Sequence, residues 1–128
     1  MWPFGGAGKQ RVLIVEDDVA MRTMLGVCLG GMGWEVAEAA NGLEGMAMAL
    51  ERPPELILLD LAMPLMVGTD ALIHLRANPK TAKVVVIVVT AHGALEDIER
   101  CLALGANDYL TKPFDFSQLK DKIDRLIK

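Results

Sequence analysis

Short apolar segments alternate with amphipathic segments along the whole sequence, and this alternation limits the possible folds more than any other feature. The apolar segments are rich in leucine and β-branched residues, as buried strands are, and between them apolar residues recur at helical spacing. Strands that alternate strictly with helices form a parallel sheet covered by helices on both faces. The expected strands are 11–15, 34–38, 56–59, 83–89 and 108–111, and the expected helices are 19–29, 43–50, 69–77, 95–102 and 116–127.

The order of the strands follows from how apolar each one is. Segments 56–59 and 84–89 are the most apolar and are expected at the centre, while 34–38 mixes polar and apolar residues as an edge strand does. The order 2-1-3-4-5 meets both conditions and places a topological switch point between the first and third strands. We therefore predict an α/β fold with a doubly wound, five-stranded parallel sheet in this order.

Glycine and proline mark the ends of the first two helices. The segment 30–33 contains three glycines and is expected to end the first helix, and Pro53 closes the second. The expected buried stripe of the second helix consists of Leu43, Met46, Ala47 and Leu50.

Length and composition exclude several classes of protein. The 128 residues suit one domain, 10–128, after a glycine-rich segment, 1–9, that we expect to be a flexible arm. The longest aliphatic run has six residues, far fewer than the roughly 18 that cross a membrane. The net charge of −4, with both signs interspersed, offers no basic surface for nucleic acid. Cys28 and Cys101 lack metal-binding spacing, so we expect reduced thiols and a cytoplasmic location.

Polar side chains follow the expected strands at the ends that share one edge of the sheet. Glu16 and Asp17 follow the first strand, Asp60 ends the third, Thr90 ends the fourth, and Lys112 follows the fifth. Three carboxylates at the switch point would repel one another, and Mg²⁺ is the hard cation that such a small oxygen set suits. The added lysine and hydroxyl predict a pocket for a transferable phosphoryl group.

Four motifs in this order resemble those of the receiver domains of two-component response regulators, over residues 11 to about 127. The motifs are Val-Glu16-Asp17-Asp, Leu-Leu-Asp60-Leu-Ala-Met-Pro64, Val-Val-Thr90-Ala91 and Tyr109-Leu-Thr-Lys112-Pro113-Phe. The resemblance implies a flavodoxin-like three-layer sandwich and a phosphorylation-switched signalling module. Such a module is not a conventional enzyme, because it catalyses only its own phosphotransfer and slow self-dephosphorylation.

The resemblance also implies a phosphoacceptor and a metal site. Asp60 corresponds to the acceptor of a phosphoryl group from a histidine kinase or a histidine phosphotransfer protein. Asp17 corresponds to a direct Mg²⁺ ligand, Glu16 to a ligand through water, and the Ala62 backbone carbonyl to a further ligand. Asp18 is expected only to cap the first helix.

Three further residues correspond to those that sense the phosphoryl group in this family. Lys112 would pair with a phosphoryl oxygen, Thr90 would move to bond another, and the Tyr109 side chain would follow Thr90. The Lys112–Pro113 peptide bond resembles the cis bond of the family. The implied downstream partner is a protein, bound through helix 95–102, strand 108–111 and helix 116–127, and a phosphate-dependent homodimer is an alternative use of this face.

The chain departs from the family pattern at two places. The apolar segment 65–68 replaces a more polar loop, and neither Ala62 nor His92 offers a group that positions water. Slow self-dephosphorylation is the expected consequence.

Two other functions share a strand-end site of this kind. A haloacid-dehalogenase-like phosphatase also uses an aspartate and Mg²⁺, but it needs a second aspartate where this chain has Ala62. A flavodoxin-like carrier would need a phosphate loop after the first strand, and the acidic segment 16–18 would repel the FMN phosphate.

Overall fold

Strands and helices alternate in the computed structural model, which describes residues 10–61, 68–91 and 95–127. The elements in chain order are β1 (Arg11–Val15), α1 (Val19–Gly31), β2 (Glu35–Ala39), α2 (Gly42–Glu51), β3 (Leu56–Asp60), α3 (Gly68–Ala77), β4 (Val85–Thr90), α4 (Leu95–Ala103), β5 (Asp108–Thr111) and α5 (Phe116–Leu126). The predicted alternation is confirmed. The observed boundaries of β2, β3 and β4 differ from the predicted ones by one or two residues, and those of β1 and β5 agree.

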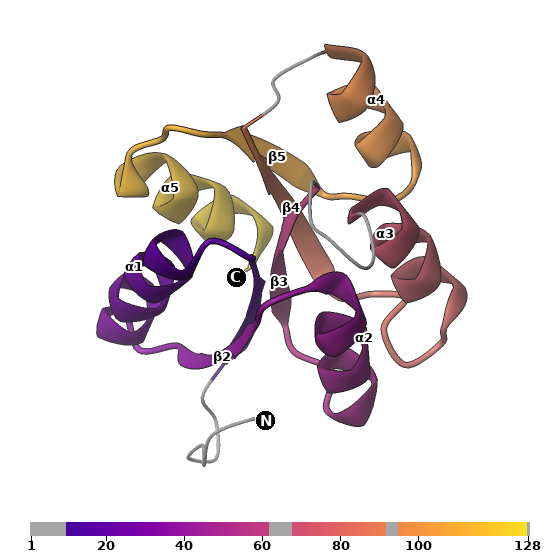
Figure 1. The fold of residues 1–128 in the computed structure, drawn as a ribbon, viewed down its shortest axis with the longest axis horizontal. Coiled ribbons are helices and arrows are strands. Elements are labelled where there is room, and N and C mark those ends of the chain that lie inside the picture. Colours follow the sequence, from indigo (N-terminus) through magenta and orange to yellow (C-terminus); the bar gives the residue numbers. More distant parts are fainter. Residues whose placement is uncertain (1–9, 62–67, 92–94, 128) are drawn as a thin grey trace.

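The strands form one parallel sheet in the order β2-β1-β3-β4-β5, as predicted. Helices α1 and α5 cover one face, and α2, α3 and α4 cover the other (Figure 1). Each face has its own apolar core, because alternate strand residues point to opposite sides of the sheet. The result is a three-layer sandwich of the doubly wound α/β class.

Burial along the strands explains their positions in the sheet. All five residues of β3 are buried, as are the last five of β4, so these runs are continuously apolar apart from their terminal polar residues. In β2 exposure varies along the strand, and β2 lies at an edge. The central and edge positions predicted from the sequence are therefore confirmed.

The buried face of α2 is not the predicted stripe. Met46 is buried, but Leu43, Ala47 and Leu50 are exposed, and the helix faces the sheet through Gly42, Gly45, Met46, Met48 and Ala49. A Cβ at Gly45 would lie only 2.8 Å from a methyl carbon of Val15. The small residues bring α2 close to β1, and this approach turns the larger leucines to solvent.

Helix α1 ends later than predicted. The helix includes Gly30 and Gly31, and the chain reverses at Gly33, whose φ of 95° lies in the region that favours glycine. The Met32 and Gly33 amides donate to carbonyls of the last helical turn, at 3.0 and 3.1 Å. The left-handed glycine, rather than the first glycine of the group, ends the helix.

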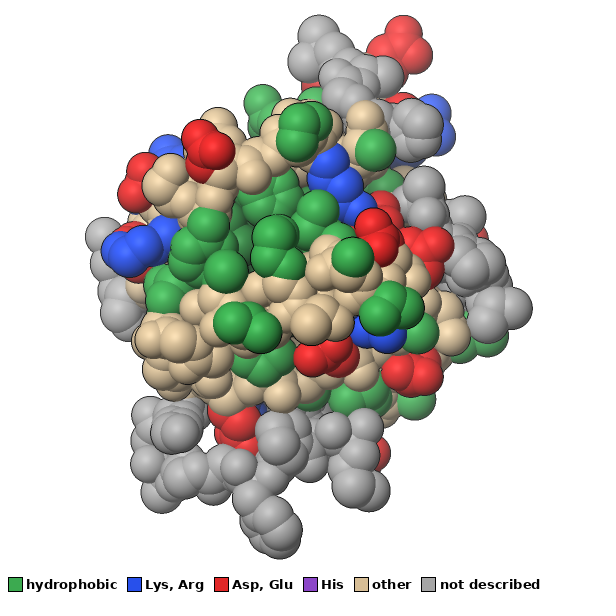
Figure 2. Space-filling view, turned by 60° about the vertical axis from the view of Figure 1, so that its left-hand side comes forward, with side chains coloured by type: hydrophobic (Ala, Val, Ile, Leu, Met, Phe, Trp, Pro, Cys, Tyr) green, Lys and Arg blue, Asp and Glu red, His purple; other side chains and the backbone are tan. Residues whose placement is uncertain are grey.

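Hydrophobic side chains are exposed on both sides of the sheet, and those on the side of α2, α3 and α4 are Leu43, Leu50, Ile73 and Leu102. Figure 2 shows hydrophobic side chains gathered on the side that carries α1 and α5, and Val19, Met24 and Val27 of α1 are exposed. The exposed residues of α4 are mostly charged, with Glu96, Asp97, Glu99 and Arg100 among them. Among the described residues, no helix combines the length and hydropathy that a membrane span requires.

Candidate functional site

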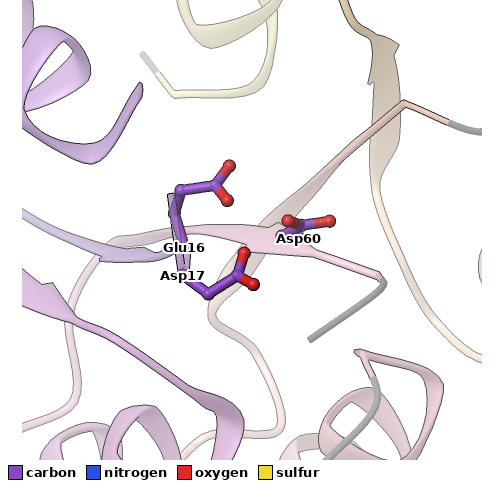
Figure 3. A group of neighbouring side chains, drawn as sticks. All are labelled: Glu16, Asp17 and Asp60. Atoms are coloured by element: carbon purple, nitrogen blue, oxygen red, sulfur yellow. The ribbon is translucent and has the colours of Figure 1, made fainter. Parts of the chain in front are cut away.

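Three carboxylates converge at the carboxyl edge of the sheet. Glu16 and Asp17 directly follow β1, and Asp60 ends β3, which pairs with β1. Each of the three offers an oxygen, and these oxygens all lie within 4.8 Å of one another (Figure 3). Glu16 is only 2% exposed and Asp60 is also buried, whereas Asp17 is exposed. The clustering predicted from the strand ends is confirmed.

Lys112 brings a positive charge into the cluster. Its Nζ donates to Glu16 Oε1 at 2.6 Å and lies 3.5 Å from Asp60 Oδ2. The backbone amide of Lys112 donates to the Thr90 carbonyl at 2.8 Å, which extends the pairing of β4 and β5 to the site. The Lys112–Pro113 bond is cis, as expected.

The ionisation of Glu16 and Lys112 reflects their burial and their contact. Burial raises the pKa of Glu16, and the negative charge of Asp60 adds to this effect, while the hydrogen bond from Lys112 opposes it; the net pKa is raised. Burial lowers the pKa of Lys112, but the hydrogen bond to Glu16 and the charge of Asp60 outweigh it, and the net pKa is raised. Lys112 is therefore a cation at neutral pH.

Thr90 and Tyr109 lie on the two strands beyond Asp60. Asp60 pairs with Val89, so Thr90 comes one residue beyond the position level with Asp60, and it is fully buried. Tyr109 is half-buried against the core on the α2–α4 face, with Lys122 Nζ 5.1 Å from the centre of its ring. Thr90 is therefore on β4, which pairs with β3, and Tyr109 is on β5, which pairs with β4 at the edge of the sheet.

The backbone that carries Glu16 and Asp17 is held by several contacts. The Asp18 side chain caps α1 by accepting from the Ala20 amide at 3.0 Å, as predicted. The Asp18 amide donates to Glu16 Oε2 at 3.2 Å. Arg22, which the sequence analysis did not single out, donates from Nη1 to the Glu16 carbonyl at 2.7 Å.

The acidic cluster fits a small, hard divalent cation. Its donors are carboxylate oxygens, the preferred ligands of Mg²⁺, and the exposed Asp17 leaves a path to solvent. A divalent cation would relieve the repulsion that Lys112 alone offsets only in part.

Comparison with known proteins identifies the family. Residues 12–124 match the family described as the response regulator receiver domain. The chain belongs to this family. Receiver domains are phosphoacceptor signalling domains rather than conventional enzymes, so neither the phosphatase nor the FMN carrier considered above is retained.

Relatives of this receiver domain include single-domain proteins and larger regulators. It is 38% identical to a probable chemotaxis protein CheY of Rhizobium etli, over 92% of each chain. It is 30% identical to sporulation initiation phosphotransferase F of Bacillus subtilis, over 93% of this chain and 94% of the relative. It is 36% identical to the DNA-binding dual master transcriptional regulator RpaA of Synechocystis. This match covers 92% of the present chain but only 49% of the regulator.

Solved structures share the fold closely. Chemotaxis protein CheY4 of Vibrio cholerae has a TM-score of 0.89 and 28% identity, covering 94% of this chain and all of that one. The receiver domain of a sensor histidine kinase from Pseudomonas aeruginosa has a TM-score of 0.86 and 32% identity, covering 94% of this chain and 98% of that one. That structure has a magnesium ion coordinated in its active-site cleft.

Some predicted positions lie outside the described residues. These are Ala62, whose carbonyl is the expected additional metal ligand, the apolar loop that follows it, and His92. The expectation of slow self-dephosphorylation rests on these positions and stays a prediction, as does the flexible arm at 1–9.

Proposed function

We propose that this receiver domain accepts a phosphoryl group on Asp60 from a histidine kinase or a histidine phosphotransfer protein, and then changes the face through which it binds other proteins. The observation that carries the proposal is the contact of Lys112 Nζ with the buried carboxylates of Glu16 and Asp60 at the switch point of the sheet. This arrangement supports the proposal, because the Asp60 carboxylate lies beside a cation at the edge where open α/β sheets bind their ligands.

In the proposed transfer, a carboxylate oxygen of Asp60 attacks the phosphorus of a phosphohistidine. The new bond joins this oxygen to phosphorus, the phosphorus–nitrogen bond breaks, and its electron pair stays on the donor imidazole. Lys112 Nζ, which lies 3.5 Å from Asp60 Oδ2, is placed to stabilise negative charge on the transferred group. Lys112 therefore acts by charge, without gaining or losing a proton.

Glu16, Asp17 and Asp60 are the residues that would hold Mg²⁺, together with the Ala62 carbonyl. When bound, the ion would offset the charge of the carboxylates and of the phosphoryl oxygens. The magnesium in the cleft of the Pseudomonas receiver domain supports this choice.

The metal proposal predicts opposite effects of Asp17→Asn with and without Mg²⁺. Without metal, the variant should be slightly more stable than the wild type, by at most about 1 kcal/mol, because one of three like charges is removed at an exposed position. With Mg²⁺, the wild type should gain stability and the variant should gain less. Thermal melts with and without Mg²⁺ check this. A variant that melts lower without metal and gains as much from Mg²⁺ would contradict it.

Thr90 is proposed to link the phosphoryl group to β4 and β5. Thr90→Ala should still accept phosphate on Asp60, but the phosphate-dependent change in amide exchange over 95–110 should fall by more than half. Thr111→Ala is the matched control, because Thr111 pairs with Thr90 on the neighbouring strand. An unaltered exchange response in Thr90→Ala, or an equal loss in Thr111→Ala, would argue against this role.

The proposed binding face consists of α4, β5 and α5. Its exposed residues carry charges of both signs, such as Glu99 and Lys120, and Lys122 Nζ lies 5.1 Å from the centre of the half-buried Tyr109 ring. Mixed charges around an aromatic residue suit a reversible protein interface, whereas a nucleic-acid surface needs an excess of basic residues. We therefore propose a protein partner or a phosphate-dependent homodimer on this face, with no direct contact to nucleic acid.

Charge reversals test this face. Glu99→Lys and Lys120→Glu should each weaken phosphate-dependent association several-fold, measured by sedimentation of the phosphorylated protein and by partner binding. The control is Glu51→Lys at the exposed end of α2. Glu44, another exposed glutamate of α2, is less suitable as a control, because its carboxylate accepts a hydrogen bond from the Ala40 amide and helps to begin the helix. Loss of association in the α2 variant alone would place the interface elsewhere.

A cytoplasmic location is also proposed. Cys28 and Cys101 are both free thiols, which suits a reducing compartment. A histidine kinase as phosphodonor would act in the same compartment.

A further inference from the structure

We propose that Arg22 is a positioning residue for residues 16–18, the acidic loop after β1, and that it sets the affinity of the site for divalent metal. The inference rests on the proposed metal site of the preceding section. Arg22 donates from Nη1 to the backbone carbonyl of Glu16 at 2.7 Å, and its Nε lies 3.3 Å from Glu38 Oε1. Its side chain is only 18% exposed.

These contacts fix the peptide that joins the two metal-binding residues at the end of β1. The Glu16 carbonyl belongs to the peptide between Glu16 and Asp17, so holding this oxygen restricts the direction in which Asp17 leaves the strand. The Glu16 amide is held as well, because it donates to the Ala39 carbonyl at 3.0 Å. The backbone of Glu16 is thus bound on both sides.

The anchor of Arg22 lies on β2. Glu38 belongs to this strand and pairs in register with Ile14 of β1. Ala39, which binds the Glu16 amide, is the next residue of β2. Arg22 itself is in the first turn of α1, where its amide donates to the Asp18 carbonyl at 2.9 Å. Strand β2 therefore holds the acidic loop through two contacts. The Ala39 carbonyl binds the Glu16 amide directly, and Glu38 binds Arg22, which in turn binds the Glu16 carbonyl.

Gly26 makes room for the anchor. A Cβ at this position would lie 3.0 Å from Glu38 Oε2, so any side chain there would press on the carboxylate. Gly26 stands one turn after Arg22 on α1, and both face β2. The close approach explains a glycine in the middle of a helix, where glycine otherwise costs stability.

The positioning role of Arg22 and its positive charge predict opposite changes in Mg²⁺ affinity when the residue is removed. As a cation bound to the backbone of Glu16, Arg22 repels Mg²⁺, so loss of its charge alone would strengthen metal binding. Loss of its hydrogen bond frees the peptide before Asp17 and would weaken metal binding. Removal of residues that orient metal ligands typically costs about 10- to 100-fold in affinity. The sign of the change therefore separates the two roles.

Arg11 provides a matched control at the opposite edge of the sheet. It also donates to a backbone carbonyl, that of Pro53 at 2.9 Å, and faces a glutamate, Glu55, at 3.8 Å. Its side chain is 21% exposed. Arg11→Ala should therefore lower the melting temperature of the metal-free protein much as Arg22→Ala does, without a direct effect on the acidic loop.

The experiment measures Mg²⁺ affinity by titration calorimetry for the wild type, Arg22→Ala and Arg11→Ala. We expect about tenfold weaker binding in Arg22→Ala and a change within about twofold in Arg11→Ala. Arg22→Lys, which keeps the charge and one donor, should recover part of the affinity. Unchanged or tighter binding in Arg22→Ala, or an equal loss in Arg11→Ala, would overturn the inference.

Two milder variants test the same arrangement without deleting the arginine. Gly26→Ala and Glu38→Gln both disturb the anchor, so each should weaken Mg²⁺ binding, and Glu38→Gln should add little to Arg22→Ala. Full affinity in both would also overturn the inference. A wild type that binds no Mg²⁺ would instead contradict the proposed metal site itself, so the two failures are distinguishable.

Discussion

Asp60→Asn is expected to take up no phosphate under conditions in which the wild type gains one phosphoryl group. The conditions are Mg²⁺ and a small donor such as acetyl phosphate, and mass spectrometry of the intact protein provides the measurement. The carboxamide has nearly the same shape as the carboxylate but lacks its nucleophilic oxygen. The expected effect is therefore complete loss, rather than a slower rate.

The loss should not come from unfolding. Asp60 is one of three neighbouring carboxylates, so replacing it with a neutral group relieves repulsion and should leave the metal-free melting temperature equal or higher. Asp18→Asn is the control, because Asp18 is exposed and asparagine caps a helix as well as aspartate does. This control should be phosphorylated like the wild type. Phosphate uptake by Asp60→Asn at the wild-type rate would disprove the assignment.

The site was largely predictable because it depends on topology. Strict alternation of strands and helices leaves few possible sheet orders, and any order with the first and third strands adjacent brings Glu16 and Asp17 to Asp60. The backbone alone sets these positions. The contact of Lys112 with Glu16, by contrast, was not predicted, since the resemblance assigned Lys112 only to the phosphoryl group.

Contacts of long side chains and the rotation of helices were not predictable. Arg76 of α3 donates to the Gly105 carbonyl and to Asn107, about 30 residues away, and nothing local signals this. Arg22 is similar, because its carbonyl and carboxylate partners belong to other elements. The buried face of α2 was wrong for a related reason: hydrophobic periodicity weights leucine over glycine, whereas the close approach at Gly45 decides the packing.

Lys112→Ala is expected to cause the second large effect, a loss of stability in the metal-free protein. The substitution leaves Glu16 buried without its cation and beside Asp60, and breaking such a pair costs about 3 kcal/mol. Urea unfolding at pH 7 without metal measures the loss. Lys122→Ala is the matched control, since Lys122 is 19% exposed and pairs with Asp108 at 3.0 Å, but Asp108 is only half-buried. The control should lose about 1 kcal/mol or less.

The pH dependence of this loss follows from the two raised pKa values. The folded-state pKa of Glu16 is already raised by burial, and without Lys112 it should rise further, because the lowering effect of the Lys112 hydrogen bond is then lost. Acidification protonates Glu16, so the deficit of Lys112→Ala should shrink as pH falls through that pKa. Lys112 has a raised pKa in the fold, so its contribution is present at neutral pH and disappears as pH rises through that value. The deficit should therefore be largest between these limits, and Mg²⁺ should reduce it by supplying another cation. A deficit at pH 7 no larger than that of Lys122→Ala would show that Lys112 does not hold the acidic cluster together.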